Sequence, residues 1–585
     1  MAYQKAQQQS VKLPAWRRRV LLFGLLFGFL GLGLRSVYLQ SMHKAFLQQK
    51  GDARYSRNIL LPAHRGKITD RNGELLAISS PVESLWASPA DVSMSVSQRK
   101  ALAKLLAIKA SEIDKKVSNT KREFVYLKRR VSPEFAQKIL SLEIPGIFKQ
   151  REYKRFYPAG DVTAHIVGFT GIDDNGQEGL ELAQNTNLSG KAGSRRVIKD
   201  RKGDIVEDLD TIKKPQDGQN LVLSIDRRIQ YLAFRELVKA VDLYKAKAAA
   251  AVVLDAKTGE VLAMVNLPTY NPNNPVDIKG KTRNRTITDI FEPGSTLKPV
   301  TAAAAMQFGD YKPDTPIQTA PGYMSIGPAT IHDAHPHGML TVAGVIQKSS
   351  NVGAAKMALS LQNSQLWSTF NQLGFGKTVF SKPIKKGDPY IFPGEAAGKL
   401  RPYKTWRPIE KATMSYGHGI SVTLLQLARA YTVFANEGEL KQVTLFKSNN
   451  IQVGHQVFSP KVANDVKSML ELVTQPGGTA LRAQVAGYRV AGKTGTAHKL
   501  GPTGYEKDKY VGSFVGFAPA SSPRLIMAVM IDEPTSGEYY GGTVAAPVFS
   551  AVMADALRML AVPQDAPNNN VVITPEALED VKEMI

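Results

Sequence analysis

The first forty residues contain a basic stretch followed by an apolar one. Every residue from Val20 to Leu34 is apolar or glycine, and continuing to Gln40 gives about twenty residues, or about 30 Å as an α-helix. The basic residues before this run are Lys5, Lys12, Arg17, Arg18 and Arg19. The pattern predicts a membrane-spanning helix over 20–40, a cytoplasmic tail over 1–19 and the rest of the chain outside. A cleaved signal peptide is the alternative, but no A-x-A-like site follows the run.

Basic and turn-forming residues dominate the region over 45–215. The Asn72-Gly73 pair stands between apolar positions and predicts a β-hairpin. The segment 213–218 has the composition of a linker. We therefore predict an N-terminal module over 45–215.

After this linker the pattern becomes that of a mixed domain. Asp226 is a candidate N-cap for a helix that continues through Leu237, and residues 294–306 predict a buried helix. The segments expected as strands are 220–225, 249–254, 260–265, 488–491, 510–518 and 525–531. These elements predict an α+β domain over 216–562. A linker and a short helix capped by Thr574 are expected over 563–585.

The composition excludes some classes of functional site but does not identify a function. The chain has 585 residues, and its 75 basic against 51 acidic residues give a formal net charge of +24. Such a chain favours anionic surfaces, such as nucleic acid, anionic lipid or acidic polymers. Nucleic acid is not expected as a partner, because the body of the chain is predicted to lie outside the cytoplasm. The sequence contains no cysteine, which excludes disulfides, thiolate metal sites and cysteine nucleophiles.

Three short motifs carry candidate chemistry. Ser295 and Lys298 form an S-x-x-K at a predicted helix start, where positions three apart share a face. A lysine kept neutral by burial or by another cation can activate such a serine as a nucleophile. Ser349 and Asn351 belong to an S-x-N, and residues 493–495 are a K-T-G. In this order the motifs are the signature of penicillin-binding proteins and serine β-lactamases.

Each motif alone recurs by chance, so the context decides between copies. Further S-x-x-K matches at 97–100 and 118–121 lie in charged, solvated stretches. A second K-T-G, at 257–259, lies where a hairpin turn is predicted. We predict that these copies carry no chemistry.

The surroundings of the motifs make the resemblance more specific. The segments that resemble the active-site motifs of class B penicillin-binding proteins are 291–299, 347–353 and 491–497. Those similar to motifs of the family's N-terminal module are 65–73, 155–160 and 179–181. Residues 284–289 and the chain length most resemble the division-specific septal transpeptidase. The region before Pro215 lacks the E-D-x-x-F-x-x-H motif of bifunctional class A enzymes. The resemblance implies a membrane helix, an elongated β-rich pedestal or dimerisation-like module, and a transpeptidase domain related to serine β-lactamases.

The resemblance also implies how the reaction proceeds. Ser295 would attack the carbonyl of the penultimate D-Ala of a stem peptide and form an acyl-enzyme, with release of the terminal D-Ala. Lys298 would accept the serine proton, and Ser349 would relay a proton to the leaving amine. Backbone N–H groups of Ser295 and Thr496 would form the oxyanion hole. The amine of a neighbouring stem peptide would then resolve the ester.

Other matching residues are expected to hold the substrate. By resemblance, Asn351 would hydrogen-bond the substrate amide. Lys493 would hold the terminal carboxylate together with Thr494, Gly495 and Thr496. The candidates for an aromatic wall of the groove, with strand packing as the alternative, are Tyr510, Tyr539 and Tyr540.

The resemblance implies no cofactor and no metal. His332, His335 and His337 have a spacing that invites a metal, but no carboxylate or cysteine pattern completes a site. We predict solvated loop histidines. The implied partners are peptidoglycan stem peptides, β-lactams, the membrane, and a polytopic glycan polymerase with other membrane proteins of the division complex. A G-x-x-x-G spacing at Gly24 and Gly28 offers a close helix contact for such a partner.

Four functions remain open on the motifs. The favoured hypothesis is a septal D,D-transpeptidase, anchored by one helix in the inner membrane with its catalytic domain in the periplasm. An elongation-specific transpeptidase has the same motifs. A D,D-carboxypeptidase or β-lactamase transfers the acyl group to water on the same fold. A penicillin sensor or inactive division scaffold is the fourth, and the intact motif residues argue against it.

Overall fold

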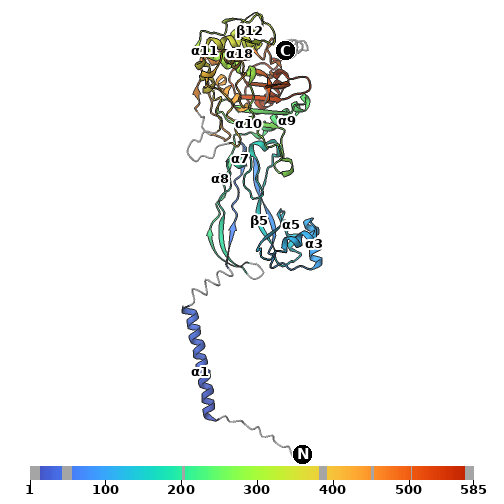
Figure 1. The fold of residues 1–585 in the computed structure, drawn as a ribbon, viewed down its shortest axis with the longest axis vertical. Coiled ribbons are helices and arrows are strands. Elements are labelled where there is room, and N and C mark those ends of the chain that lie inside the picture. Colours follow the sequence, from blue (N-terminus) through green and yellow to red (C-terminus); the bar gives the residue numbers. More distant parts are fainter. Residues whose placement is uncertain are drawn as a thin grey trace, which may run out of the picture. The chain divides into compact units, whose positions relative to one another are not determined.

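The computed structural model describes residues 14–42, 56–199, 205–380, 392–448, 453–501 and 504–572 (Figure 1). The chain forms two compact units. Unit 1 comprises residues up to Ala63, Glu83–Glu152 and Lys191–Gln216, and unit 2 comprises the remainder. Most of the expected cytoplasmic tail, and the expected helix capped by Thr574, lie outside the described residues.

The apolar N-terminal run forms the helix α1 (Ala15–Val37), and a π-helical turn over Tyr38–Met42 follows it. The helix begins at Ala15 rather than at Val20, because Trp16 and three arginines continue the helical backbone before the apolar run. None of its residues is buried. It is long and apolar enough to cross a membrane.

The rest of unit 1 contains an antiparallel sheet and a helical cluster. The sheet strands are β1 (Ser56–Leu61), β6 (Gly193–Lys199) and β7 (Ile205–Lys213). The cluster comprises α3 (Val96–Leu106), α4 (Ala110–Val117), β4 (Val125–Val131) and α5 (Pro133–Leu140). Its core includes Leu85, Leu102, Ile113 and Ile139, all buried. Ser95 and Ser132 cap α3 and α5 with their hydroxyls.

Unit 2 begins with short strands around the predicted Asn72-Gly73 turn. β2 (Ile68–Thr69) and β3 (Leu75–Ala87) are antiparallel across this turn, which confirms the predicted hairpin. The expected strand over 220–225 is shorter, because only β8 (Leu221–Val222) pairs, in parallel, with β2. The strand β5 (Ile147–Phe156) begins in unit 1 and ends in unit 2. The helical elements that follow it are η2 (Gly160–Val162), α6 (Ala164–Val167), α7 (Gly179–Ala183) and α8 (Asn185–Leu188).

A buried ion triad connects the three N-terminal motif segments. The guanidinium Nε atoms of Arg65 and Arg155 each lie 2.6 Å from the carboxylate of Glu181. All three side chains are buried. The other guanidinium nitrogens donate to backbone carbonyls and hydroxyls, so every nitrogen of the two buried guanidinium groups has a hydrogen-bond partner. This explains why the motifs at 65–73, 155–160 and 179–181 occur together.

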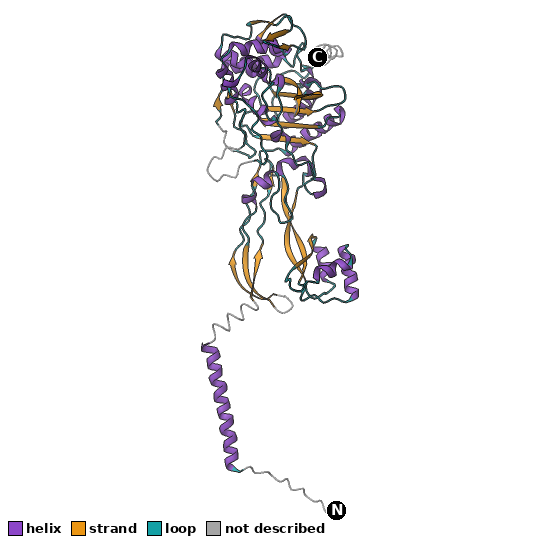
Figure 2. Cartoon of the chain, in the orientation of Figure 1, coloured by secondary structure: helices purple, strands orange, loops and turns teal. Residues whose placement is uncertain are grey.

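The centre of unit 2 is a five-stranded antiparallel sheet of order β10-β9-β19-β18-β17 (Figure 2). Its strands are β9 (Ala248–Asp255), β10 (Val261–Leu267), β17 (Ala491–Gly501), β18 (Gly504–Ala518) and β19 (Leu525–Asp532). Four of them match predicted segments. The strand expected over 488–491 instead begins at Ala491 and carries the K-T-G. β17 is an edge strand, so one side of its backbone faces no neighbouring strand of this sheet.

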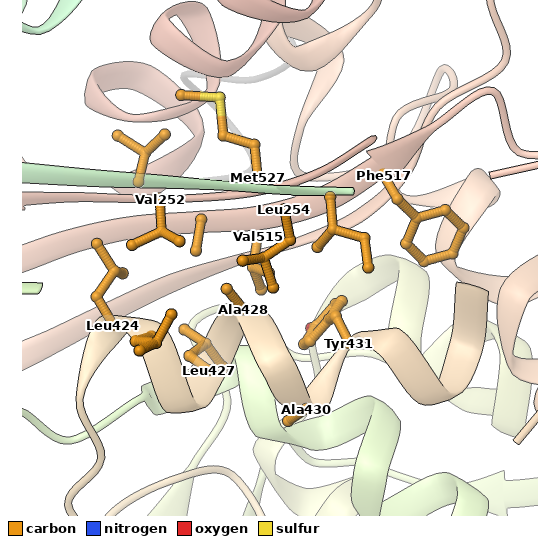
Figure 3. Close-up of a cluster of buried hydrophobic side chains, with 14 of the residues drawn as sticks. Val252, Leu254, Leu424, Leu427, Ala428, Ala430, Tyr431, Val515, Phe517 and Met527 are labelled. Atoms are coloured by element: carbon orange, nitrogen blue, oxygen red, sulfur yellow. The ribbon is translucent and has the colours of Figure 1, made fainter. Parts of the chain in front are cut away.

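Three helices bury apolar faces against the sheet. Asp226 caps α9 (Arg227–Tyr244) as predicted, and α9 packs on α20 (Ala546–Met559). α16 (Leu424–Ala430) packs against β9 and β19. Figure 3 shows its side chains facing those of Val252, Leu254 and Val515 on the strands, whereas Met527 points away from the helix.

Unit 2 also contains further helices and small two-stranded sheets. The helical elements are α10 (Arg285–Thr288), η4 (Gly294–Leu297), α11 (Lys298–Phe308), α12 (Val342–Lys348), α13 (Asn351–Ser360), α14 (Asn363–Gln372), α15 (Pro408–Met414), α17 (Thr432–Ala435), α18 (Pro460–Leu472) and α19 (Gly541–Val544). The small strand pairs are β11 (Pro316–Gln318) with β14 (Met339–Thr341), β12 (Tyr323–Ile326) with β13 (Ala329–His332), and β15 (Glu439–Leu440) with β16 (His455–Gln456). The predicted helix over 294–306 is therefore a 3₁₀ turn followed by an α-helix.

Candidate active site

The S-x-x-K serine lies on the 3₁₀ turn η4, and its lysine is the first residue of α11. Side chains three apart eclipse on a 3₁₀ turn. The Lys298 ammonium accordingly lies 2.9 Å from the Ser295 hydroxyl. Lys298 is fully buried, whereas Ser295 is half-buried and lines a cavity. The local backbone thus holds a lysine amine against an accessible hydroxyl.

A glycine behind the turn fixes its position. Gly417 has φ +86°, and a Cβ at this position would lie 2.2 Å from the carbonyl oxygen of Gly294. A side chain would therefore displace the turn that carries Ser295. On the other side, the backbone of Thr496 is close: a Cβ on Gly294 would lie 3.6 Å from its nitrogen. The serine is thereby positioned beside the K-T-G strand.

The S-x-N brings a second hydroxyl to Lys298. Ser349 ends α12 in a left-handed conformation, φ +61°, which is uncommon for a residue other than glycine. This conformation presents both its hydroxyl and its carbonyl oxygen to Lys298, and the hydroxyl lies 3.0 Å from the ammonium nitrogen. The Lys493 ammonium is also 3.0 Å from the Ser349 hydroxyl. One hydroxyl therefore bridges two lysines.

The K-T-G residues lie on β17, the edge strand of the sheet. Lys493 is fully buried and also donates to the Thr494 hydroxyl, 3.2 Å away. Thr494 in turn lies 2.9 Å from the hydroxyl of Thr479, which no sequence motif had marked. Gly495 contributes backbone only, and its carbonyl accepts a bond from Ser513. Thr496 accepts a hydrogen bond from the backbone N–H of Gly541 through its hydroxyl.

The electrostatics favour neutral amines in this site. Burial lowers the pKa of Lys298 well below its usual range, and the nearby charge of Lys493 lowers it further. Burial likewise lowers the pKa of Lys493 to about 7. Burial also lowers the pKa of the neighbouring His418 to about 4, so this imidazole is neutral at physiological pH. A neutral lysine beside a hydroxyl is a competent proton acceptor.

Asp333 was not identified from the sequence, yet it holds the S-x-N in place. Its carboxylate accepts hydrogen bonds from the Ser350 hydroxyl at 2.7 Å and from the backbone N–H groups of Asn351 and Val352. The Asn351 amide donates to the carbonyl of His332 at 2.8 Å. The carboxylate caps α13, where negative charge is favoured. The one indication of this role in the sequence is that Asp333 is an acidic residue between His332 and His335.

The cavity in front of Ser295 has a volume of about 720 Å³. Its lining includes Ser349, Asn351, Thr494 and Thr496. His335 and His337 also line it and are half-buried, so the prediction of solvated loop histidines is wrong for these two. Hydrogen bonds on both sides of the loop hold it against the cavity, from Asp333 to Gly322 and from Thr319 to Gly338. His332 is exposed, as predicted.

The three tyrosines lie together at the cavity. Tyr510 and Tyr539 stack with ring centroids 4.0 Å apart, and Tyr539 and Tyr540 with centroids 4.4 Å apart. All three are half-buried and line the cavity. His498 extends the stack, with its ring 4.5 Å from that of Tyr510. This surface suits apolar or planar groups.

The other copies of the motifs do not have buried partners of this kind. Ser97 and Lys100 are exposed on α3, and Ser118 and Lys121 are exposed after α4. The second K-T-G forms the turn between β9 and β10, where its Gly259 has φ +74°. The prediction that this copy is a structural turn is confirmed.

The sequence also matches two known domain families. The Penicillin-binding Protein dimerisation domain matches residues 60–223, and the Penicillin binding protein transpeptidase domain matches residues 249–554. The chain belongs to the penicillin-binding protein transpeptidase family. This confirms the resemblance to class B penicillin-binding proteins, the α+β fold and the assignment of the chain as a transpeptidase enzyme.

Similar proteins cover nearly the whole chain. The probable peptidoglycan D,D-transpeptidase PenA of Neisseria meningitidis serogroup A / serotype 4A is 40% identical, over 96% of this chain and 96% of its own. The peptidoglycan D,D-transpeptidase FtsI of Escherichia coli (strain K12) is 41% identical, over 96% of this chain and 95% of its own. The transpeptidase domain of penicillin-binding protein 3 from Burkholderia pseudomallei is 48% identical. Its solved structure superposes with a TM-score of 0.53, over 59% of this chain and 98% of that chain.

Proposed function

We propose that this protein is the septal peptidoglycan D,D-transpeptidase of its cell. It crosslinks stem peptides through an acyl-enzyme on Ser295. The observation that carries the proposal is the bonded set Ser295–Lys298–Ser349–Lys493, which lies at a cavity large enough for a peptide. The similarity to a protein named FtsI supports the division role.

Acylation follows from the geometry. The Ser295 oxygen attacks the carbonyl carbon of the penultimate D-Ala, and its proton passes to the neutral amine of Lys298, 2.9 Å away. The oxyanion is stabilised by the backbone N–H groups of Ser295 and Thr496, each such donor contributing about 2.7–4 kcal/mol. When the C–N bond breaks, the leaving D-Ala amine receives a proton through the Ser349 hydroxyl, which Lys298 contacts.

The substrate is held along the edge strand. The terminal carboxylate binds the Lys493 ammonium with the hydroxyls of Thr494 and Thr496, and its negative charge favours the protonated lysine. The open edge of β17 allows the peptide backbone to bond as an added strand, with the Asn351 amide on the opposite side. A Cβ on Gly495 would lie 2.8 Å from the carbonyl oxygen of Pro293, so this glycine lets β17 pack closely against the segment that carries Ser295. The stacked Tyr510, Tyr539 and Tyr540 form the wall against which upstream groups pack.

A β-lactam uses the same groups. Its carboxylate occupies the Lys493 site and its strained amide acylates Ser295, so we propose that β-lactams inhibit the protein covalently. The inactive-scaffold hypothesis finds no support, because all five motif side chains are present and bonded. An elongation role and a hydrolytic role use the same site, so they are distinguished by the lifetime of the acyl-enzyme and by the phenotype of depleted cells.

The apolar N-terminal helix supports a proposal for the location of the enzyme in the cell. We propose that α1 spans the inner membrane with the basic N-terminus in the cytoplasm and unit 2 in the periplasm. A methyl group added at Gly24 or Gly28 would meet no heavy atom of the described residues within 4 Å, which leaves this side of the helix open for a partner helix. The proposed partners are the polytopic glycan polymerase and other membrane proteins of the division complex.

Two experiments test the proposal, one on the purified protein and one in cells. Purified full-length protein is labelled with fluorescent penicillin, and the lifetime of the acyl-enzyme is followed. A label that persists for hours supports a transpeptidase, whereas turnover within seconds indicates a β-lactamase. Depletion of the protein in cells then assigns the role: filaments without septa support division, and rounded cells indicate elongation.

A further inference from the structure

The positions of Thr494 and His498 on β17 define two ends of the cavity, and the acceptor peptide is expected to enter from one of them. Thr494 and His498 are separated along β17 by about 13 Å. His498 contacts Tyr510 and therefore belongs to the tyrosine end of the cavity. Thr494 contacts the hydroxyl of Thr479, which belongs to the other end. Because the leaving D-Ala is held at Thr494, that residue departs toward the Thr479 end.

The direction of departure fixes the direction of attack. Acyl transfer to an amine is the reverse of the step that expels the D-Ala amine, so the acceptor amine approaches along the same path. The carbon that bears the acceptor amine also bears a substituent. This substituent takes the place that the D-Ala carboxylate has left. The rest of the acceptor strand then extends beyond Thr479, along the part of the cavity that the donor strand does not use.

The side chains beyond Thr479 are cationic or neutral donors. The Lys348 ammonium lies 3.4 Å from the position of a Cβ on Gly477, so it is next to the cavity wall there. Among the described residues, no carboxylate or carbonyl is bonded to this ammonium. Nε2 of His335 is buried and has no hydrogen-bond partner within the described part of the chain. His337 is close enough to both for their charges to act on it.

The nearby carboxylate does not neutralise this group. The Asp333 oxygens already accept bonds from Ser350, Asn351 and Val352. Lys348 follows Gln347, whose side chain lies along α18 and the turn after it. The half-buried ammonium is therefore directed to the cavity with its charge available to a ligand.

We propose that Lys348, His335 and His337 form the subsite for a carboxylate of the acceptor peptide, and this rests on the proposed transpeptidase function. The ligand is a peptide amine that carries a carboxylate further along the strand than the amine-bearing carbon. In the transfer step, the acceptor nitrogen forms a C–N bond to the acyl carbon and the Ser295 ester bond breaks. The nitrogen's proton returns to the Ser295 oxygen through Lys298. Lys348 binds the acceptor and takes no part in this proton transfer.

The test measures how the acyl-enzyme divides between water and an acceptor. A D-Ala-terminated thioester donor forms the acyl-enzyme, and two acceptor peptides are supplied that differ only in the distal group, a carboxylate or its primary amide. In Lys348→Met we expect transfer to the carboxylate acceptor to fall at least about tenfold, and transfer to the amide acceptor to change less than about twofold. Lys348→Arg keeps the charge and should retain most of the preference for the carboxylate.

Penicillin acylation serves as the measure of an intact site. Lys461→Met, which removes an exposed lysine on α18, is the matched control and should behave as the wild type. Equal transfer to both acceptors by wild-type protein, or an equal loss for both in Lys348→Met, would overturn the subsite. Failure of the wild type to form an acyl-enzyme, or to transfer it to any amine, would instead contradict the proposed function.

Discussion

Lys298 and Lys493 share one hydrogen-bond partner, because the ammonium nitrogen of each lies 3.0 Å from Oγ of Ser349. Both lysines are fully buried. Two positive charges so close together in a buried site disfavour each other, and one amine is thereby made available as a base. The substrate carboxylate decides which one, because it favours the charged form of the lysine that it contacts.

This arrangement predicts a bell-shaped pH dependence of acylation. The rate by a D-Ala-terminated substrate should rise with pH as Lys298, whose pKa is lowered by burial and by Lys493, loses its proton. It should fall again as Lys493, with a pKa of about 7 in the free protein, loses the charge that holds the carboxylate. The second-order rate constant of acylation, measured from pH 5 to 10, checks this. A rate independent of pH would contradict a lysine base.

The second prediction concerns the nucleophile. Ser295→Ala should abolish covalent labelling by fluorescent penicillin, because it removes the cavity-lining hydroxyl that lies 2.9 Å from the Lys298 amine. The matched control is Ser97→Ala, which removes the exposed serine of another S-x-x-K and should label normally. Gel fluorescence of the purified proteins gives the answer. Persistent labelling of Ser295→Ala would refute the assignment.

The third prediction compares the two K-T-G sequences. Lys493→Ala removes the cation that binds the substrate carboxylate, a loss of about 1.5–3 kcal/mol, and should lower acylation on the order of tenfold to a hundredfold. Lys257→Ala alters a turn and should leave acylation unchanged. Stopped-flow acylation rates test both, and circular dichroism verifies that each variant is folded. The reverse order of sensitivity would show that the context of a K-T-G does not decide its role.

The fourth prediction concerns topology and uses the absence of cysteine from the sequence. Single cysteines are introduced at Ser10, in the basic tail, and at Ser97, exposed on α3. In intact spheroplasts, a maleimide that does not cross membranes should label the Ser97→Cys protein and spare the Ser10→Cys protein until the cells are lysed. Labelling with the opposite pattern would reverse the proposed orientation.

The motifs were predictable because their chemistry depends on short spacings. The Ser295–Lys298 contact follows from positions three apart in one turn, and the turn at Gly259 follows from local sequence. Asp333 and Thr479 were not predictable, since they reach the site through long-range contacts with Ser350 and Thr494. The helix bounds at α1 also differed, because hydropathy marks the apolar run and says nothing of where the helical backbone begins.

The position of the histidine loop also could not be predicted from the sequence. His335 and His337 stand in a polar, turn-rich segment, a pattern typical of solvated loops. The backbone bonds that hold the loop to Gly322 and Thr319 decide its actual position at the cavity. No periodicity in the sequence reports such bonds, because each joins a residue of the loop to one that stands more than ten positions earlier in the chain.

The last prediction concerns Asp333, which acts on the site in two ways. Its carboxylate bonds Ser350 and the backbone of Asn351, so it positions the S-x-N. Its negative charge also raises the pKa of Lys298, opposing the effects of burial and of Lys493. Asp333→Asn keeps one acceptor oxygen but removes the charge. We expect acylation at its pH optimum to fall about tenfold, because a charged hydrogen-bond acceptor typically contributes about 1.5–3 kcal/mol.

The pH profile distinguishes the two effects of Asp333. Without the negative charge, the pKa of Lys298 falls further, so the rising limb of the acylation profile should move to lower pH in Asp333→Asn. A purely structural role would lower the rate and leave the limb in place. Asp310→Asn, which removes an exposed carboxylate after α11, is the control and should change neither. A limb that moves to higher pH would contradict this role of Asp333, because removing an attractive charge cannot stabilise the protonated amine.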